Sequence, residues 1–210
     1  DYICDLALCP TAYECGNLNA AGHKKMVRMK GGGNVFIVGN PACESLKYFI
    51  DKNAKRRNRC VITCHRAENR TDRRMKNLME AVCFIAREYP SWRFVWVKHL
   101  RPDWAAEVER RFADLELPKP ANVELVDPMT RGDFIHLLST SSMCITDSGG
   151  VQEESPVLGV PVIVFRMVTD RPYTRLSMLA RPESDTSIMK AWDHLYPQSP
   201  PEGASTYMLW

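Results

Sequence analysis

A run of polar residues and glycines joins a short apolar strand to a helix in segment 146–156, which reads Thr-Asp-Ser-Gly-Gly-Val-Gln-Glu-Glu-Ser-Pro. Adjacent glycines allow backbone N–H groups to close on a bulky anion, and a helix N-terminus directs unpaired N–H groups and the positive end of its dipole at the same place. We therefore predict that Ser148, Gly149 and Gly150 bind phosphate. Glu154, one helical turn further, would accept hydrogen bonds from sugar hydroxyls. The alternative interpretation is a tight strand-to-helix turn with a solvated acidic first turn, and the motif alone fits both.

The elements around this run alternate between short apolar strands and amphipathic helices. The expected strands are residues 59–64, 92–97, 123–126, 143–146 and 160–165. The expected helices are residues 71–88, 103–115 with Asp103 as N-cap, 131–138, and a helix from the glycines to about 158. The first helix carries apolar residues at helical spacing, Phe84 among them. This alternation predicts an α/β fold, a Rossmann-like parallel sheet with helices on both faces.

Polar residues follow every one of these strands. In chain order they are His65, Arg66 and Glu68; His99; segment 128–134; Ser148 to Gly150; and segment 166–171. Ligands of parallel sheets bind beyond the carboxyl ends of the strands, so all five clusters are expected along one rim. Any one alone, such as His99 in a loop or Phe134 in a core, is more often structural. Together, a histidine and an arginine facing a helix N-terminus suit a pyrophosphate, and an aromatic ring could flank a nucleobase.

Composition narrows the class of protein. The chain has 210 residues, of which 45% are hydrophobic and 25% charged, and no apolar run of the roughly 20 residues that cross a bilayer. A cytoplasmic setting without membrane association is therefore expected. The net charge is +3, and the basic runs 52–59 and 70–76 lack the interleaved aromatics of a nucleic-acid reader, so no nucleic acid is expected. These runs are interpreted as solvated surface, with an anionic small ligand as the alternative.

The cysteines point to a reducing compartment. Eight of them are scattered, several within apolar strands or helices, which favours buried free thiols. Cys60, Cys64 and His65 lie close together but lack zinc-site spacing, so no metal site is predicted.

Several motifs together resemble the C-terminal half of the UDP-N-acetylglucosamine 2-epimerase family. They are segments 64–69 (Cys-His-Arg-Ala-Glu-Asn), 99–102 (His-Leu-Arg-Pro), 128–134, 146–156 with 158–162, and 169–172 (Thr-Asp-Arg-Pro). Upstream, segments 9–11 and 38–41, and Asn17 and Leu18 before Gly22, resemble the passage between that family's two domains. The resemblance covers about residues 1 to 172.

The resemblance implies a two-domain fold of the glycosyltransferase-B type whose C-terminal domain holds the UDP portion of the substrate. The family interconverts UDP-N-acetylglucosamine and UDP-N-acetylmannosamine by eliminating UDP and adding it back, a step in making polysaccharide precursors. It implies no cofactor and a full-length homodimer.

Residue roles carry over only at matching positions. His65 would be catalytic, assisting the departure and return of UDP. Met129 and Phe134 would border the uracil, Glu154 would hold the ribose, and Arg171 would meet the diphosphate or sugar. The remaining predicted UDP-binding residues are Arg66, Glu68, His99, Ser148, Gly149 and Gly150.

The chain departs from the family pattern at Ala67, Arg101, Asp170 and Tyr173. After Pro172 the resemblance is expected to stop, and residues 196–205, rich in proline, are expected to be extended or disordered. The expected organisation is 1–40, the end of an N-terminal domain; 41–172, the UDP-binding domain; and 173–210, a divergent tail.

The sequence predicts a fragment of an epimerase, since nothing precedes the strand at 3–8 and the family's N-terminal domain supplies the groups that move the C2 proton. The alternatives are a glycosyltransferase of the same fold and a non-catalytic UDP-sugar binding module. The non-hydrolysing branch of the family is favoured over the hydrolysing one.

Overall fold

The computed structural model describes residues 6–20, 34–171 and 174–206, and the chain divides into two compact units, Asp1–Ser45 and Leu46–Trp210. Gly22, Pro172 and Tyr173, named above, lie outside the described residues. Asn40 caps the short helix α2 (Pro41–Glu44) by accepting from the Ala42 N–H at 2.9 Å, and this helix lies in the first unit.

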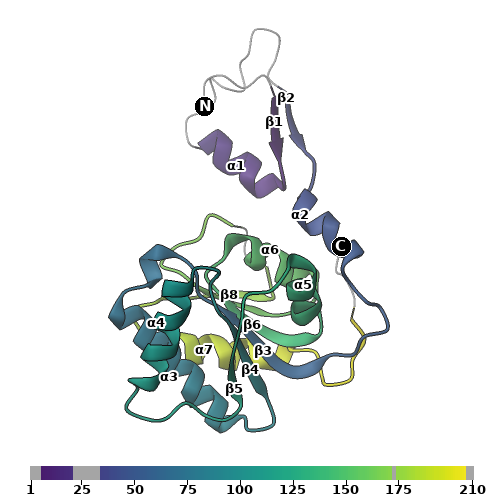
Figure 1. Ribbon diagram of the computed structural model, residues 1–210. Helices are drawn as coiled ribbons and strands as arrows, with labels where there is room; N and C mark the ends of the chain where they lie inside the picture. Colours follow the sequence, from purple (N-terminus) through teal and green to yellow (C-terminus); the bar gives the residue numbers. More distant parts are fainter. Residues whose placement is uncertain (1–5, 21–33, 172–173, 207–210) are drawn as a thin grey trace. The chain divides into compact units, whose positions relative to one another are not determined.

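The first unit is a parallel strand pair with a helix between its strands. β1 (Leu6–Cys9) pairs with β2 (Asn34–Ile37), and α1 (Ala12–Ala20) lies between these strands in the chain (Figure 1). Within the described residues, the strand predicted at 3–8 covers Leu6–Cys9 and so ends one residue later than predicted.

The second unit is built on a six-stranded sheet in which every strand pair is parallel. Its strands are β3 (Arg57–Thr63), β4 (Arg93–Val97), β5 (Val123–Val126), β6 (Ser141–Thr146), β7 (Val162–Phe165) and β8 (Ser177–Ala180). Their order across the sheet is β5-β4-β3-β6-β7-β8. The predicted α/β fold with a Rossmann-like parallel sheet is confirmed, and the five predicted strands agree with the structure to within two residues at each end.

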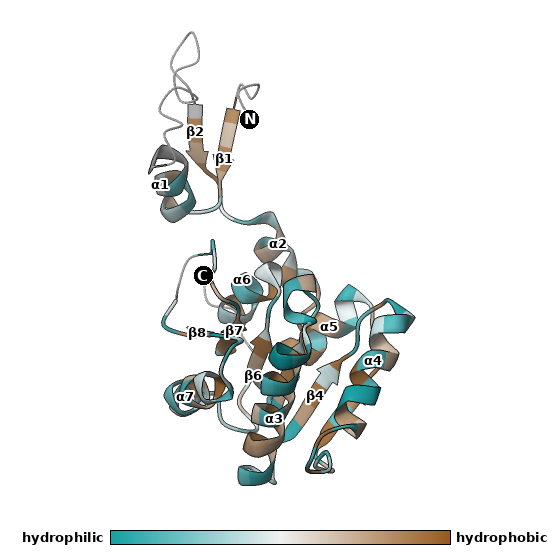
Figure 2. Ribbon diagram, turned by 90° about the vertical axis from the view of Figure 1, so that its left-hand side faces the viewer, coloured by the Kyte–Doolittle hydropathy of each residue, from teal (hydrophilic) through white to brown (hydrophobic). Residues whose placement is uncertain are grey.

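Helices cover both faces of this sheet (Figure 1). They are α3 (Asp72–Glu88), α4 (Pro102–Ala113), α5 (Arg131–Ser139), α6 (Gly149–Val157) and α7 (Asp185–Leu195), with short 3-10 turns η2 (Ser45–Tyr48), η3 (Ala67–Asn69) and η4 (Tyr196–Gln198). The apolar residues of α3, α4 and α7 join those of the strands in one buried cluster, whereas α5 and α6 pack on the other face. In Figure 2 α3 and α4 alternate between hydrophobic and hydrophilic colours, as expected of helices with one buried side.

Two local predictions about these helices are wrong. The N-cap of α4 is Arg101, and Asp103 lies inside the first turn, where its carboxylate pairs with the Arg101 guanidinium. The proline at the first helical position, Pro102, favours this earlier start. Phe84 is 50% exposed, because it lies beside and not within the buried stripe of α3 that includes Leu78 and Ile85.

Residues 174–206, predicted as part of a divergent tail, contain a strand and a helix that pack into the second unit, and of the segment 196–205 the part after η4 is irregular chain. β8 pairs with β7 along its length, and α7 packs against α3. Within α7, Trp192 is 1% exposed and its ring lies 5.3 Å from that of Trp92 and 5.6 Å from that of Phe94. The proline-rich residues 196–205 also contact the sheet, since Ser142 Oγ in β6 donates to the Pro200 carbonyl at 2.8 Å. This segment completes the sheet and its core.

The strand order creates a crevice at one point of the sheet. β3 and β6 are neighbours, but the chain leaves β3 through α3 toward β4 and leaves β6 through α6 toward β7. The two connections therefore diverge from the carboxyl ends of β3 and β6, where Thr63 pairs with Thr146. Such a switch point is where ligands bind in open α/β sheets.

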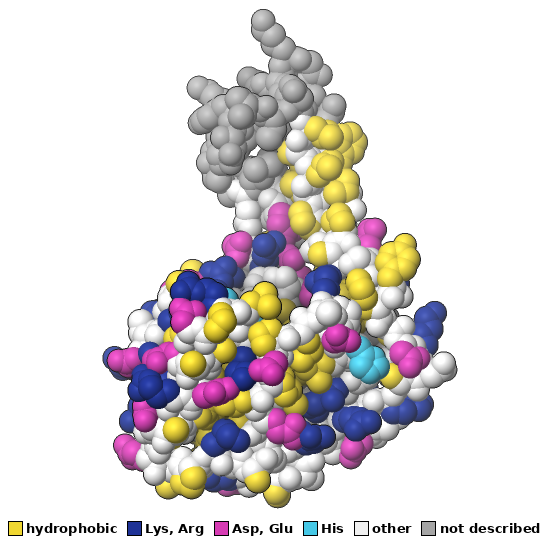
Figure 3. All heavy atoms as spheres, in the orientation of Figure 1, with side chains coloured by type: hydrophobic (Ala, Val, Ile, Leu, Met, Phe, Trp, Pro, Cys, Tyr) yellow, Lys and Arg dark blue, Asp and Glu magenta, His cyan; other side chains and the backbone are white. Residues whose placement is uncertain are grey.

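The surface bears charges of both signs. On the face shown in Figure 3 the Lys and Arg side chains are interspersed with Asp and Glu and do not form a continuous basic stripe. Within the described ranges, no helix is long and apolar enough to cross a membrane.

Candidate functional site

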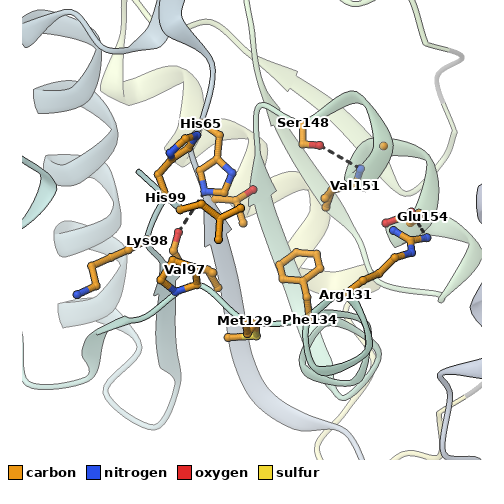
Figure 4. A pocket seen from close by; sticks show the side chains of 14 residues that line it. His65, Val97, Lys98, His99, Met129, Arg131, Phe134, Ser148, Val151 and Glu154 are labelled. Atoms are coloured by element: carbon orange, nitrogen blue, oxygen red, sulfur yellow. Dashed lines mark hydrogen bonds and ion pairs between the residues drawn. The ribbon is translucent and has the colours of Figure 1, made fainter. Parts of the chain in front are cut away.

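A cavity of about 390 Å³ lies at this switch point in the second unit (Figure 4). It is lined by Thr63, His65, Val97, Lys98, His99, Leu100, Pro128, Met129, Arg131, Phe134, Ser148, Gly150, Val151 and Glu154. Seven predicted site residues are among them: His65, His99, Met129, Phe134, Ser148, Gly150 and Glu154. The polar residues that follow four different strands therefore do meet in one cavity.

One wall of the cavity is the turn from β6 into α6. Ser148 is the N-cap of α6, and its Oγ accepts from the Val151 N–H at 3.5 Å. A second hydrogen bond stabilises the turn, because the Ser148 N–H donates to Thr146 Oγ1, at the end of β6, at 3.0 Å. The helix N-terminus beside the cavity carries backbone N–H groups without intrahelical partners and a partial positive charge, which together suit an anion.

The two glycines of this turn adopt ordinary backbone angles. The glycines with positive φ among the described residues are Gly39, Gly159 and Gly203, and neither Gly149 nor Gly150 is among them. A Cβ on Gly150 would find its nearest neighbour, Ser148 Oγ, only at 4.0 Å. The turn therefore does not require glycine for its conformation, which favours the interpretation that a ligand approaches the backbone there.

The opposite wall carries two histidines from neighbouring strands. His65 follows β3 and His99 follows β4, and their rings meet edge to face with centroids 5.0 Å apart. His65 Nε2 lies 3.4 Å from the Val97 carbonyl oxygen. Burial, the neighbouring His65 and the guanidinium groups of Arg70 and Arg101 lower the pKa of His99. A neutral His99 agrees with its Nδ1 accepting from the Arg101 N–H at 3.0 Å.

Glu154 closes the far end of the cavity from the second turn of α6. Its side chain is 4% exposed, and its Oε1 accepts from Arg131 Nη2 at 2.8 Å (Figure 4). Burial raises the pKa of Glu154, while the hydrogen bond and charge of Arg131 lower it. Met129 and Phe134 lie between this ion pair and the histidines, so the floor of the cavity is apolar.

Four predicted binding residues do not line the cavity. Arg66 and Glu68 pair with each other at 2.7 Å on the surface of the loop after β3. Gly149 adjoins the cavity-lining Ser148 and Gly150, and a Cβ on it would lie 3.3 Å from Arg171 Nε. Arg171 itself donates to Glu153 Oε1 at 3.2 Å, which holds its guanidinium beside the start of α6.

Sequence reasoning missed three polar residues of the cavity wall, Thr63, Lys98 and Arg131. Lys98 points away from the cavity toward Glu109 and Asp127, so it serves as a structural cation (Figure 4). Arg131 falls inside segment 128–134 and is the first residue of α5, directly after the N-cap. Its position at the start of this helix was the only local signal that it could lie at the rim. The described part of the chain has no group of three or more His, Cys, Asp or Glu placed to hold a metal ion.

Comparison with known proteins decides the family. A family model described as UDP-N-acetylglucosamine 2-epimerase matches residues 1–204. The chain belongs to this family. The match continues past Pro172, so the prediction that the resemblance stops there is wrong, in agreement with the folded β8 and α7.

Individual members of the UDP-N-acetylglucosamine 2-epimerase family cover the same part of the chain. The Bacillus subtilis enzyme of that name is 31% identical over 179 residues, which are 81% of this chain and 43% of the relative. The S. aureus MnaA–UDP co-structure superposes with a TM-score of 0.75 and 26% identity over 92% of this chain and 51% of that one. The Neisseria meningitidis enzyme bound to UDP-GlcNAc gives a TM-score of 0.68 and 27% identity over 92% of this chain and 53% of that one. The chain thus spans about half the length of these relatives, whose fold is of the glycosyltransferase-B type.

Proposed function

We propose that this chain forms the UDP-binding half of a UDP-N-acetylglucosamine 2-epimerase, which interconverts UDP-GlcNAc and UDP-ManNAc. The observation that carries the proposal is the cavity between the His65 loop and the N-terminus of α6, at the switch point of the sheet. Membership of the family and the UDP and UDP-GlcNAc complexes of two relatives support it.

The nucleotide would lie across the cavity with its diphosphate at Ser148, Gly149 and Gly150. Backbone N–H groups there donate to the phosphate oxygens, and Arg171 adds a positive charge beside them. The uracil would lie at the apolar wall of Met129 and Phe134.

The remaining predicted residues have their own parts in this proposal. Glu154 would accept from the ribose hydroxyls at the far end of the cavity, and His99 would form the wall behind His65. Arg66 and Glu68 form an ion pair outside the cavity, so we assign them to its outer rim.

The reaction proceeds by elimination and readdition. A base removes the C2 proton, the anomeric C1–O bond breaks, and UDP leaves with the electron pair, so that a C1–C2 double bond remains in the sugar. UDP then adds back to C1 while C2 is protonated on the opposite face. Donors already aimed at the diphosphate stabilise the charge that develops on it, and His65 would assist this departure and return. Among the described residues we assign none to the proton transfer at C2.

The setting of the full-length protein follows from the same assignment. We expect a cytoplasmic homodimer of the non-hydrolysing branch that supplies polysaccharide precursors. Cys60, Cys83 and Cys144 are buried thiols outside any disulfide, which supports a reducing compartment.

Calorimetry of the chain with UDP tests the binding site. Glu154→Ala and Gly150→Val should each abolish or strongly weaken UDP binding, because one removes the ribose acceptor and the other fills the space for phosphate. Glu116→Ala is the matched control, since it removes a carboxylate that is 85% exposed and lies outside the cavity. Unchanged affinity in both cavity variants would overturn the assignment.

Turnover by the full-length protein in deuterium oxide tests the reaction. Epimerisation by elimination and readdition places solvent deuterium at C2 of the product. A glycosyltransferase of the same fold would instead transfer the sugar to an acceptor without exchange at C2, and a binding module would bind UDP without turnover.

A further inference from the structure

Asp147 is a completely buried carboxylate that joins the loop carrying His65 to the turn that begins α6. It lies at the end of β6, directly before the N-cap Ser148, and its exposed fraction is 0%. An acidic side chain in such a place is costly unless its oxygens are hydrogen-bonded. The hydrogen-bond donors around Asp147 therefore indicate its role.

Both oxygens of Asp147 accept from the loop that carries His65. The backbone N–H of His65 lies 2.9 Å from Oδ1 and 3.1 Å from Oδ2, and the backbone N–H of Arg66 lies 2.8 Å from Oδ2. Asn69 Nδ2 donates to Oδ2 at 3.0 Å. One carboxylate thus receives two consecutive backbone donors and a side-chain amide.

Asn69 ties the same network to a third strand. Its Nδ2 also donates to the carbonyl oxygen of Phe165, at the end of β7, at 3.1 Å. Because Phe165 O and Asp147 Oδ2 can only accept in these bonds, the amide orientation of Asn69 is fixed. Hydrogen bonds of Asp147 and Asn69 therefore join the chain at the ends of β3, β6 and β7.

The hydrogen bonds of Asp147 take the place of the strand-to-strand hydrogen bonds where the pairing of β3 and β6 ends. Pairing between β3 and β6 ends at Thr63 and Thr146, whose hydroxyl oxygens lie 2.6 Å apart. Beyond that point the chains diverge, and the Asp147 carboxylate satisfies the next backbone donors of the His65 loop. The same residue precedes the phosphate-facing turn, so it sets the position of His65 relative to Ser148.

Resting on the function proposed above, we propose that Asp147 is a positioning residue that holds the His65 backbone so that its imidazole faces the departing diphosphate. It touches no substrate and acts through His65. Pre-positioning of a reacting group contributes to the rate in the transition state, whereas UDP itself is bound mainly by the α6 turn and Glu154.

Kinetics of Asp147→Asn in the full-length protein test this role. The variant keeps the size of the side chain but replaces one acceptor oxygen by an amide that faces N–H donors. We expect kcat to fall by about 10²-fold, the loss associated with displacing a catalytic group by roughly 1 Å, with KM and UDP affinity changed far less. Asp114→Asn is the matched control, because Asp114 is 60% exposed, pairs with Arg110 at the end of α4 and lies outside the cavity.

A double-mutant cycle with His65→Ala shows whether Asp147 works through His65. If it does, Asp147→Asn should lower kcat little further in the His65→Ala background, so that the two losses are strongly non-additive. Full additivity, or equal losses in kcat and in UDP affinity, would overturn the proposal.

Amide hydrogen exchange on the unaltered chain provides a test that does not depend on how a variant folds. The His65 and Arg66 amides lie beyond the ladder, yet they should exchange slowly, as buried hydrogen-bonded groups do. Rapid exchange at both would overturn the proposal. Failure of the unaltered chain to bind UDP would instead overturn the function on which it rests.

Discussion

Arg131 Nη2 donates to Glu154 Oε1 across the far end of the cavity, joining a partly exposed guanidinium to a carboxylate that is 4% exposed. Burial raises the pKa of Glu154 above its ordinary value of 4.5, and Arg131 limits the rise. A ribose hydroxyl donates best to the ionised form, so UDP affinity should fall as the pH drops through this raised pKa. For stability the sign is opposite: a raised pKa makes protonation favour folding, and this contribution is lost as the pH rises through the folded-state value.

Arg131→Leu should move the pH dependence of UDP binding upward. Removing the guanidinium leaves burial unopposed, so the pKa of Glu154 rises further and affinity begins to fall at a higher pH than in the unaltered chain. Calorimetric titrations with UDP between about pH 5 and about pH 7, spanning the range above the ordinary glutamate pKa, measure the shift. Glu154→Gln, which cannot titrate at this position, is the control: its profile should keep the contribution of the terminal phosphate of UDP, whose second pKa is about 6, and lack that of Glu154. Coincident profiles for Arg131→Leu and the unaltered chain would contradict the ion-pair argument.

Gly150→Ala should separate stability from binding. Alanine is favoured over glycine in a helix by about 0.8–1.0 kcal/mol, and the nearest atom to the new methyl group is Ser148 Oγ at 4.0 Å. We therefore expect thermal stability to be unchanged or increased, while UDP affinity falls because the methyl group occupies cavity-lining space. Thermal melts and calorimetry on the same samples test both parts. A loss of stability together with affinity would show that Gly150 serves the fold.

His65→Ala should depress turnover of the full-length protein more than it depresses UDP affinity. A group that assists the departing diphosphate acts mostly in the transition state, and removal of one such donor typically costs about 10²–10³ in kcat. Comparison of kcat with the dissociation constant of UDP measures the difference. Proportional losses in the two quantities would make His65 a substrate anchor.

The sequence was enough to predict five of the six strands of the sheet and seven of the fourteen residues that line the cavity. Short apolar strands such as 123–126 and the Ser148-Gly149-Gly150 turn are local signals, and the rule for parallel sheets brings their ends together. Asp147 and Arg131 could not be assigned roles in this way, because their importance depends on partners 82 and 23 residues away. Local patterns do not contain such contacts.

The C-terminal segment, residues 174–206, also depends on long-range contacts that local sequence patterns do not contain. Prolines near residue 200 predict irregular chain, and residues 199–206 are irregular, but the long-range packing of β8 and Trp192 that precedes them in the chain has no local signal. The segment therefore completes a core whose other members come from α3, α4 and the strands β3 to β7.

Trp192→Ala tests whether α7 is an integral part of the second unit. The Trp192 ring is 1% exposed and contacts the rings of Trp92, Phe94 and Tyr196, so its removal leaves a large cavity beside the sheet. Truncations of this kind cost about 3–5 kcal/mol of the free energy of unfolding. Phe84→Ala is the matched control, an aromatic truncation on α3 at a side chain that is 50% exposed, and should cost about 1 kcal/mol or less. Urea denaturation of the three proteins measures the difference, and equal losses in the two variants would contradict the core position of α7.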